Sequence, residues 1–197
     1  MIDDIAYVLF SHDRIDRTVE RLARRIDRDF AVPGESADSG GDENLTLLGV
    51  LEGGRIFLED LSARLETPHR VDFLKAASYG AGDRSSGNVR IVRTPGPDLR
   101  GKRVLVVDDI YDTGRTLARI VEHVRGLGPA SLDVCVLLSK PAARVEDVAV
   151  RYVGLETPNV FVVGYGLDFN QRYRELPFIG VLKPSLAKTA ATAKNTA

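Results

Sequence analysis

An uninterrupted apolar segment near the middle of the chain limits the possible folds more than any other feature. Residues 104–107 read Val-Leu-Val-Val, and Asp108 and Asp109 follow them directly. A short apolar run without polar alternation is typical of a strand buried on both faces, as in parallel sheets. The segment 112–116, Asp-Thr-Gly-Arg-Thr, then leads into apolar residues at helical spacing. The sequence therefore predicts a central parallel strand, an acidic loop and a helix.

Strand and helix patterns alternate on both sides of this segment. Residues 15–26 carry apolar side chains at helical spacing, and residues 45–65 read as a strand, a Gly-Gly turn and a helix. This alternation predicts an α/β fold, with a parallel sheet that has helices on both faces. Such sheets bind ligands at the carboxyl ends of their strands. Further strand patterns cover 71–80, 131–140, 150–158 and 160–169, and residues 90–101 read as a strand and a turn.

Composition excludes several classes of protein. The 197 residues suffice for one domain with a sizeable core, and a net charge of -1 without a basic run argues against nucleic-acid binding. No apolar run reaches membrane-spanning length and the first residues lack a basic n-region, so we expect a cytoplasmic protein that binds no membrane. The single cysteine, Cys135, lies in an apolar run and is expected to be a core residue.

Three aspartates, Asp108, Asp109 and Asp112, stand at the expected carboxyl end of the central strand. The helix that follows would present unpaired backbone N–H groups, which favour phosphate. A sugar phosphate fits both features, because carboxylates accept hydrogen bonds from ribose hydroxyls. The alternative is that Asp112 or Thr113 caps the helix while the other carboxylates face solvent. Capping accounts for one aspartate and not for three.

This strand, acidic pair and Asp/Thr/Gly-rich loop resemble the phosphoribosyl diphosphate (PRPP) signature of type I phosphoribosyltransferases. The wider chain is similar to the hypoxanthine-guanine phosphoribosyltransferase family over roughly residues 5–184. The resemblance implies a type I phosphoribosyltransferase domain over 1–184, in which a small hood is formed by about 1–30 and 166–184, and a disordered tail over 185–197. The segments that carry it are GVLEGGRIFLEDL (49–61), VDFLKAASYG (71–80), LLSKPAAR (137–144) and FVVGYGLDFNQRYRELPFIGVL (161–182).

The resemblance implies a purine-salvage enzyme. The phosphoribosyl group of PRPP would pass to a 6-oxopurine, hypoxanthine or guanine, which gives IMP or GMP and diphosphate with Mg²⁺ as cofactor. The expected partners are these small molecules and further copies of the chain, in a dimer or tetramer. Alternatives are a transferase that prefers xanthine or guanine, a non-catalytic regulator that binds PRPP or a nucleotide, and an inactive paralogue.

Residue roles follow from the same resemblance. Asp112 is implied as the catalytic residue, which accepts a proton near purine N7. Asp108 and Asp109 would hold the ribose hydroxyls, directly or through Mg²⁺, and Asp168 matches a second metal position. The residues implied to wrap the 5′-phosphate are Asp112, Thr113, Gly114, Arg115 and Thr116.

The purine would be recognised from two other segments. Lys140 is implied to donate a hydrogen bond to the 6-oxo group, and adenine would offer an amino donor there instead. Phe161 would stack on the base, while Val162 would meet its edge through backbone groups, beside Asp168. Ser78 and Tyr79 would begin a loop that closes over the site and excludes water.

The diphosphate would bind to a loop of four residues, Leu51, Glu52, Gly53 and Gly54, and to Arg174. In the family the peptide that corresponds to Leu51–Glu52 can be cis. Position 52 is commonly lysine in the family, so Glu52 brings the opposite charge to this loop. We therefore expect weaker diphosphate or PRPP binding than in relatives with lysine.

Overall fold

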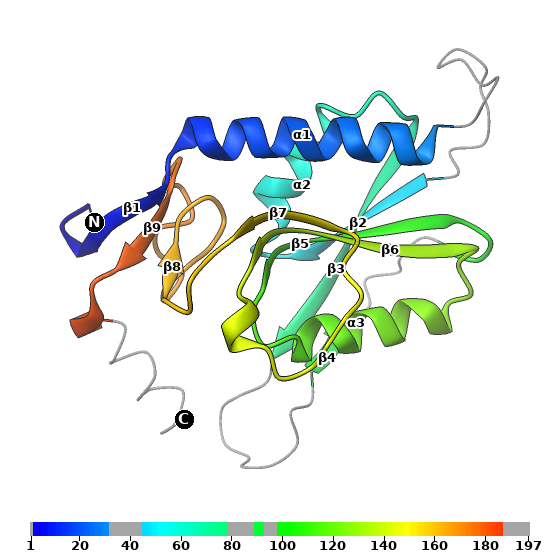
Figure 1. Ribbon diagram of the computed structural model, residues 1–197. Helices are drawn as coiled ribbons and strands as arrows, with labels where there is room; N and C mark the ends of the chain where they lie inside the picture. Colours follow the sequence, from blue (N-terminus) through cyan, green and yellow to red (C-terminus); the bar gives the residue numbers. More distant parts are fainter. Residues whose placement is uncertain (1, 32–44, 79–88, 93–97, 187–197) are drawn as a thin grey trace.

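The computed structural model describes residues 2–31, 45–78, 89–92 and 98–186 (Figure 1). A six-stranded sheet has the order β4-β3-β2-β5-β6-β7, and all neighbours are parallel except the antiparallel edge pair β3–β4. The predicted parallel sheet is confirmed. Its strands are β2 (Leu45–Leu51), β3 (His69–Ser78), β4 (Val89–Val92), β5 (Arg103–Tyr111), β6 (Ser131–Ser139) and β7 (Tyr152–Glu156).

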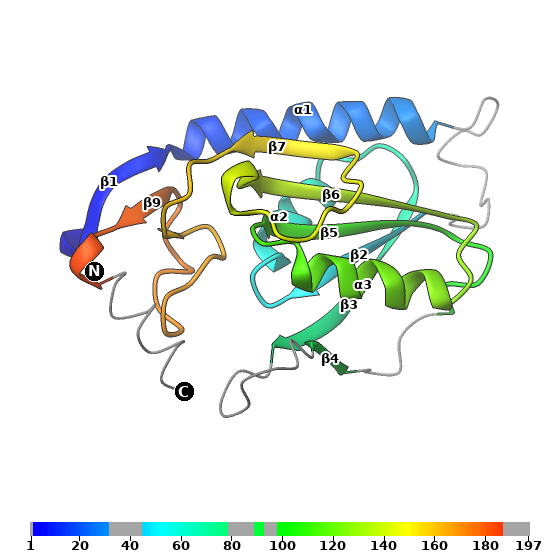
Figure 2. The same ribbon diagram turned by 60° about the horizontal axis from the view of Figure 1, so that its bottom comes forward.

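Helices cover both faces of this sheet, as predicted (Figure 2). Helices α1 (His12–Phe30) and α2 (Arg55–Ser62) pack on one face, and α3 (Arg115–Gly126) packs on the other. Strand β5 serves both layers, because successive side chains of a strand point to opposite faces. Leu105 and Val107 belong to the core under α1 and α2, whereas Val104 and Val106 belong to the core under α3.

Helix α1 forms where the sequence places an apolar stripe after a capping residue. The Ser11 hydroxyl accepts a hydrogen bond from the Arg14 N–H, which satisfies one of the free donors of the first turn. Its buried side chains recur every three or four positions and face the sheet, so the helix is held by that face. They are Ile15, Thr18, Val19, Leu22, Ala23, Ile26 and Phe30.

A small antiparallel sheet, which we call the hood, joins the two ends of the described chain (Figure 1). Its order is β1-β9-β8, with β1 (Ile5–Phe10), β8 (Val162–Val163) and β9 (Ile179–Leu182), and a 3-10 turn, η1 (Ile2–Asp4), precedes β1. The N-terminal part of the hood is shorter than the expected 1–30, because α1 packs on the large sheet. A hydrogen bond from the Tyr165 hydroxyl to Asp60 ties the hood to α2.

Two expectations about the strand pattern were wrong. The apolar stretch 160–169 is not a strand of the parallel sheet: β8 ends at Val163, and the backbone then turns with positive φ at Gly164, Tyr165 and Gly166. No helix separates β6 from β7, since their connection holds only the 3-10 turn η2 (Pro141–Ala143). Of the expected tail, residues 187–197 lie outside the described residues. None of the described helices is long and apolar enough to span a membrane.

Strand order fixes where a ligand can enter. From β2 the chain proceeds to β3 on one side, and β5 later pairs with the other side of β2. The loops that leave β2 and β5 therefore diverge to opposite faces and open a crevice at their carboxyl ends. Glu52 and Asp112 follow these two strand ends directly.

Candidate active site

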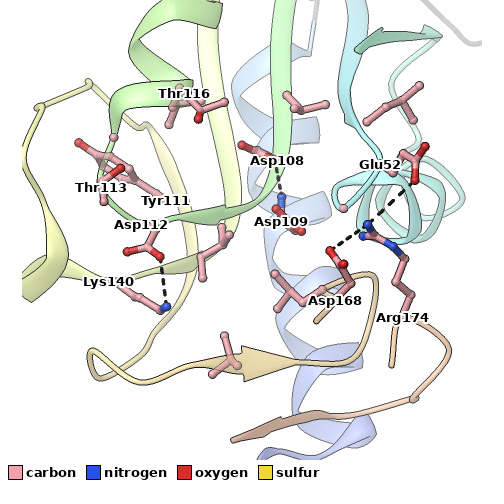
Figure 3. A pocket seen from close by; sticks show the side chains of 18 of the residues that line it. Glu52, Asp108, Asp109, Tyr111, Asp112, Thr113, Thr116, Lys140, Asp168 and Arg174 are labelled. Atoms are coloured by element: carbon pink, nitrogen blue, oxygen red, sulfur yellow. Dashed lines mark hydrogen bonds and ion pairs between the residues drawn. The ribbon is translucent and has the colours of Figure 1, made fainter. Parts of the chain in front are cut away.

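A cavity of about 590 Å³ occupies this crevice. Part of its lining comes from residues 161–174, which include β8 and the chain after it. Figure 3 shows the acidic loop and Lys140 on one side, Glu52, Asp168 and Arg174 on the other, and Asp108 and Asp109 between them. Predicted residues from the catalytic, ribose-phosphate, diphosphate, purine and metal groups thus meet in one cavity. They are Leu51, Glu52, Gly53, Asp108, Asp109, Asp112, Thr113, Gly114, Thr116, Lys140, Phe161, Val162, Asp168 and Arg174.

Asp108 and Asp109 are almost fully buried at the centre of the site, 7% and 9% exposed. The Asp109 N–H donates a hydrogen bond of 3.0 Å to Asp108 Oδ1. Burial raises the pKa of Asp108 well above its usual value, and the adjacent Asp109 charge raises it further. Burial also raises the pKa of Asp109, although hydrogen bonding with Asp108 and the charge of Arg174 act in the opposite direction. This buried carboxyl pair is suited to ligands that bring donors or positive charge.

Asp112 and Lys140 converge from different strands. Lys140 directly follows β6, and its Nζ donates a hydrogen bond of 3.3 Å to Asp112 Oδ2. The Lys140 side chain is 8% exposed, whereas that of Asp112 is 46% exposed. A buried ammonium therefore lies beside a carboxylate that a ligand can reach. The alternative that Asp112 or Thr113 caps α3 does not hold, because Gly114 occupies the N-cap position.

Residues 144–148 support the expected phosphate loop, residues 112–116, through hydrogen bonds. The Thr113 carbonyl accepts hydrogen bonds from the N–H groups of Val145 and Glu146, at 2.9 and 3.0 Å. The Tyr111 hydroxyl donates to the Glu146 carbonyl at 3.0 Å and accepts from the Val148 N–H at 2.8 Å. Gly114 has φ +86°, and a Cβ there would lie 2.0 Å from the Glu146 carbonyl oxygen. Only glycine fits between this support and the start of α3.

We expect Gly114→Ala to lower the free energy of unfolding by roughly 2–4 kcal/mol, because it adds both backbone strain and a steric clash. Urea unfolding measures this loss. Gly126→Ala is the matched control in the same helix, since a Cβ there meets no atom within 4 Å. Equal stability of the two variants would contradict the assigned support.

The expected diphosphate loop approaches the acidic pair closely. The Leu51–Glu52 peptide is cis, as the resemblance allows. A Cβ on Gly53 would lie 2.0 Å from an Asp109 carboxylate oxygen, so this loop and β5 are in direct contact. Arg174 Nη2 lies 2.9 Å from Asp168 Oδ1 and 4.0 Å from Glu52 Oε2 (Figure 3). A hydrogen bond of 2.6 Å from Arg174 Nη1 to the Gly166 carbonyl holds the guanidinium in place.

The expected purine wall comes from the hood. Val162 lies in β8, and the Phe161 ring packs edge-on against Phe169, with ring centroids 5.7 Å apart. The Phe161 carbonyl accepts a hydrogen bond of 3.0 Å from the Leu182 N–H of β9. The position of Phe161, which lines the cavity, is therefore fixed by the hood sheet.

Two predicted residues, Arg115 and Gly54, are not among the described residues that line the cavity. Arg115 begins α3 with an exposed side chain, and Gly54 is buried against the backbone of β2 and β5. Ser78 ends β3, and Tyr79 lies outside the described residues. The sequence analysis also missed Lys75 and Gln171, which line the cavity, and the support from 144–148. No local motif marks these positions, because only the register of β3 and the folding of loops bring them to the site.

The residues present fit a magnesium ion through their chemistry. Mg²⁺ prefers oxygen ligands, and Asp108, Asp109 and Asp168 line the same cavity. Among the described residues, no three such side chains are close enough to form a complete metal centre. This agrees with the usual binding of Mg²⁺ by one or two carboxylates together with phosphate oxygens of the substrate.

Comparison with known proteins places the chain among phosphoribosyltransferases. Residues 9–170 match the model of the phosphoribosyl transferase domain. The hypoxanthine phosphoribosyltransferase of Salmonella typhimurium is 40% identical over 173 residues, which cover 88% of this chain and 93% of that protein. A hypoxanthine phosphoribosyltransferase structure from Staphylococcus aureus has a TM-score of 0.84 at 35% identity, and covers 94% of this chain and 96% of that one.

The chain is also 39% identical over 186 residues to the bifunctional protein TilS/HprT of Listeria monocytogenes. That match covers 94% of this chain but spans only 27% of the length of the bifunctional relative. The Salmonella protein, by contrast, is matched over 93% of its own length. The chain therefore belongs to the phosphoribosyltransferase family, in its hypoxanthine-guanine branch.

Proposed function

We propose that this protein transfers the 5-phosphoribosyl group of PRPP to a 6-oxopurine, hypoxanthine or guanine, and releases diphosphate. The observation that carries the proposal is the pairing of Lys140 with Asp112 at 3.3 Å, beside the buried Asp108–Asp109 pair. One half of the cavity thus has a purine-directed donor and base, and the centre has carboxylates for a ribose. The names and coverage of the relatives support the same reaction.

The donor and base match the chemistry of one purine edge. O6 and N7 lie next to each other on that edge. In free hypoxanthine and guanine O6 accepts hydrogen bonds, and in the N7–H tautomer N7 carries the proton that a base can accept. Lys140 donates to O6, and Asp112 takes the proton from N7 as N9 attacks C1′ of the ribose. Adenine presents an amino donor at this position, so the buried ammonium of Lys140 would face another donor. The proposed site thereby favours 6-oxopurines.

The remaining residues act on PRPP. The C1′–O bond to diphosphate breaks as the N9–C1′ bond forms, so positive charge develops on the ribose and negative charge on the leaving group. Asp108 and Asp109 accept hydrogen bonds from the ribose hydroxyls, and the Thr113–Thr116 loop binds the 5′-phosphate with backbone N–H groups. Bound Mg²⁺ supplies charge neutralisation of the diphosphate, with Asp108, Asp109 and Asp168 as the residues that would hold it.

A panel of four bases tests the reaction class. Purified protein is incubated with PRPP and Mg²⁺ and with hypoxanthine, guanine, xanthine or adenine, and the nucleotide formed is measured. We expect nucleotide from the oxopurines, and a kcat/KM for adenine lower by on the order of 10⁴-fold. Chelation of the metal should abolish turnover. Absence of product with every base, or equal use of adenine, would contradict the proposed function. We also expect a homo-oligomer, which sedimentation would test.

A further inference from the structure

Lys75 is a cavity-lining cation to which the function proposed above gives no role. It lies on β3 in register with Leu51 of β2, immediately beside the expected diphosphate loop. The preceding residue, Leu74, packs in the core under α3. Because side chains alternate along a strand, Lys75 points to the opposite face. That is the face where the 52–54 loop leads into α2.

The other cations of the cavity are already paired with carboxylates. Lys75, Lys140 and Arg174 are the cationic side chains among the described lining residues. Lys140 is bonded to Asp112, and Arg174 lies 2.9 Å from Asp168 and 4.0 Å from Glu52. Within the described part of the chain, Lys75 forms no ion pair, and its side chain is exposed to the cavity. Lys75 is thus the cation that can accept an incoming anion without breaking an existing pair.

Glu52 makes this cation necessary. Its carboxylate lines the same cavity as those of Asp109 and Asp168, and Arg174 lies 2.9 Å from Asp168 and 4.0 Å from Glu52. A diphosphate adds further negative charge to the same region. With a 56% exposed side chain, Glu52 is free to turn away when the anion binds, but its charge remains nearby. Arg174 alone cannot balance these charges.

We propose that Lys75 binds the diphosphate group of PRPP from the β3 side, and that it offsets the negative charge that Glu52 brings to the loop. This inference rests on the proposed function and assigns diphosphate binding within it to one further residue, Lys75. The diphosphate lies between Lys75 and Arg174, with Glu52 displaced from Arg174. Positions 52 and 75 then act on one bound anion from two neighbouring strands.

Removal of the Lys75 charge tests the contact. In Lys75→Met, we expect the affinity for inorganic diphosphate, measured calorimetrically with Mg²⁺, and the KM for PRPP to weaken by about tenfold. Affinity for the product nucleoside monophosphate, which lacks diphosphate, should be unchanged. Arg70→Met is the matched control, since Arg70 lies on the same strand and outside the cavity-lining set. A Lys75→Met variant that binds diphosphate as tightly as this control would overturn the proposal.

A charge exchange tests the link with Glu52. Lys75→Glu should weaken diphosphate binding further than Lys75→Met, and Glu52→Lys should tighten it. The double variant Glu52→Lys/Lys75→Glu should recover most of the affinity lost in Lys75→Glu, because a single cation is restored to the same site. No recovery would refute the shared site. Calorimetry tests the role of Lys75 without turnover, whereas the base panel tests the transfer reaction. The Lys75 proposal and the proposed function can therefore be refuted independently of each other.

Discussion

Asp112→Asn is expected to lower kcat by about 10²–10⁴-fold, the usual contribution of a positioned general base. Asparagine keeps the size of the side chain and still offers an oxygen to Lys140 Nζ, which lies 3.3 Å from Asp112 Oδ2 in the wild type. It cannot accept the proton that leaves purine N7. Steady-state kinetics with hypoxanthine and PRPP measure the loss, and KM for PRPP should change much less than kcat.

A conservative substitution distinguishes a proton acceptor from a residue that only positions Lys140. Asp112→Glu keeps a carboxylate and should retain more of the wild-type kcat than Asp112→Asn does. Asp147→Asn, which changes an exposed aspartate outside the cavity, is the matched control and should keep the wild-type kcat. Full kcat in Asp112→Asn, or equal losses in Asp112→Asn and Asp112→Glu, would remove the general-base role.

The central strand and its acidic loop were predictable because their signals are local. The apolar run at 104–107, the aspartates after it and the helical spacing beyond are adjacent in the sequence, and β5, the loop and α3 follow that order. Strand β5 ends at Tyr111, two residues beyond the predicted strand segment 104–109, so Asp108 and Asp109 lie inside the strand. Their burial follows from this position, because the strand and its neighbours continue past them.

The hood was less predictable because its strands come from distant parts of the chain. Strand β1 pairs with β9, and Phe10 lies opposite Ile179. The stretch 160–169 was predicted as a strand of the parallel sheet, because an apolar run looks alike in a parallel sheet and in a short antiparallel one. The positive φ values from Gly164 to Gly166 end β8, and this turn brings Asp168 and Arg174 to the cavity.

Side chains on neighbouring strands were the hardest to foresee. Lys75 reaches the site because β3 pairs with β2 in one particular register, and a single sequence does not state which strands become neighbours. The same limit applies to Val145 and Glu146, whose N–H groups fix Thr113 without any sequence motif. Residues that contact ligand through a local motif are thus readable from sequence, while those that support or complete the site across strands require the fold.

Asp108→Asn is expected to have two opposite effects. Affinity for PRPP should fall by on the order of 100-fold, since hydrogen bonds to a charged group are lost at the ribose. The ligand-free protein should nevertheless become more stable at neutral pH by about 1–2 kcal/mol, because a buried carboxyl that resists ionisation is replaced by a neutral amide. The amide oxygen can still accept a hydrogen bond from the Asp109 N–H, which lies 3.0 Å from Asp108 Oδ1 in the wild type. Calorimetry and urea unfolding measure the two effects.

The stability that Asp108→Asn gains over the wild type should increase as the pH rises. Burial and the Asp109 charge raise the pKa of Asp108 in the folded state, so the folded protein retains a proton that the unfolded chain releases above about pH 4. The free energy of unfolding of the wild type therefore falls as pH rises through this window. The advantage of Asp108→Asn should grow from acidic to neutral pH, while Asp147→Asn stays close to wild type throughout. A constant difference, or a variant less stable than wild type at neutral pH, would mean that burial of the carboxyl pair does not oppose folding and that the site was not built at the expense of stability.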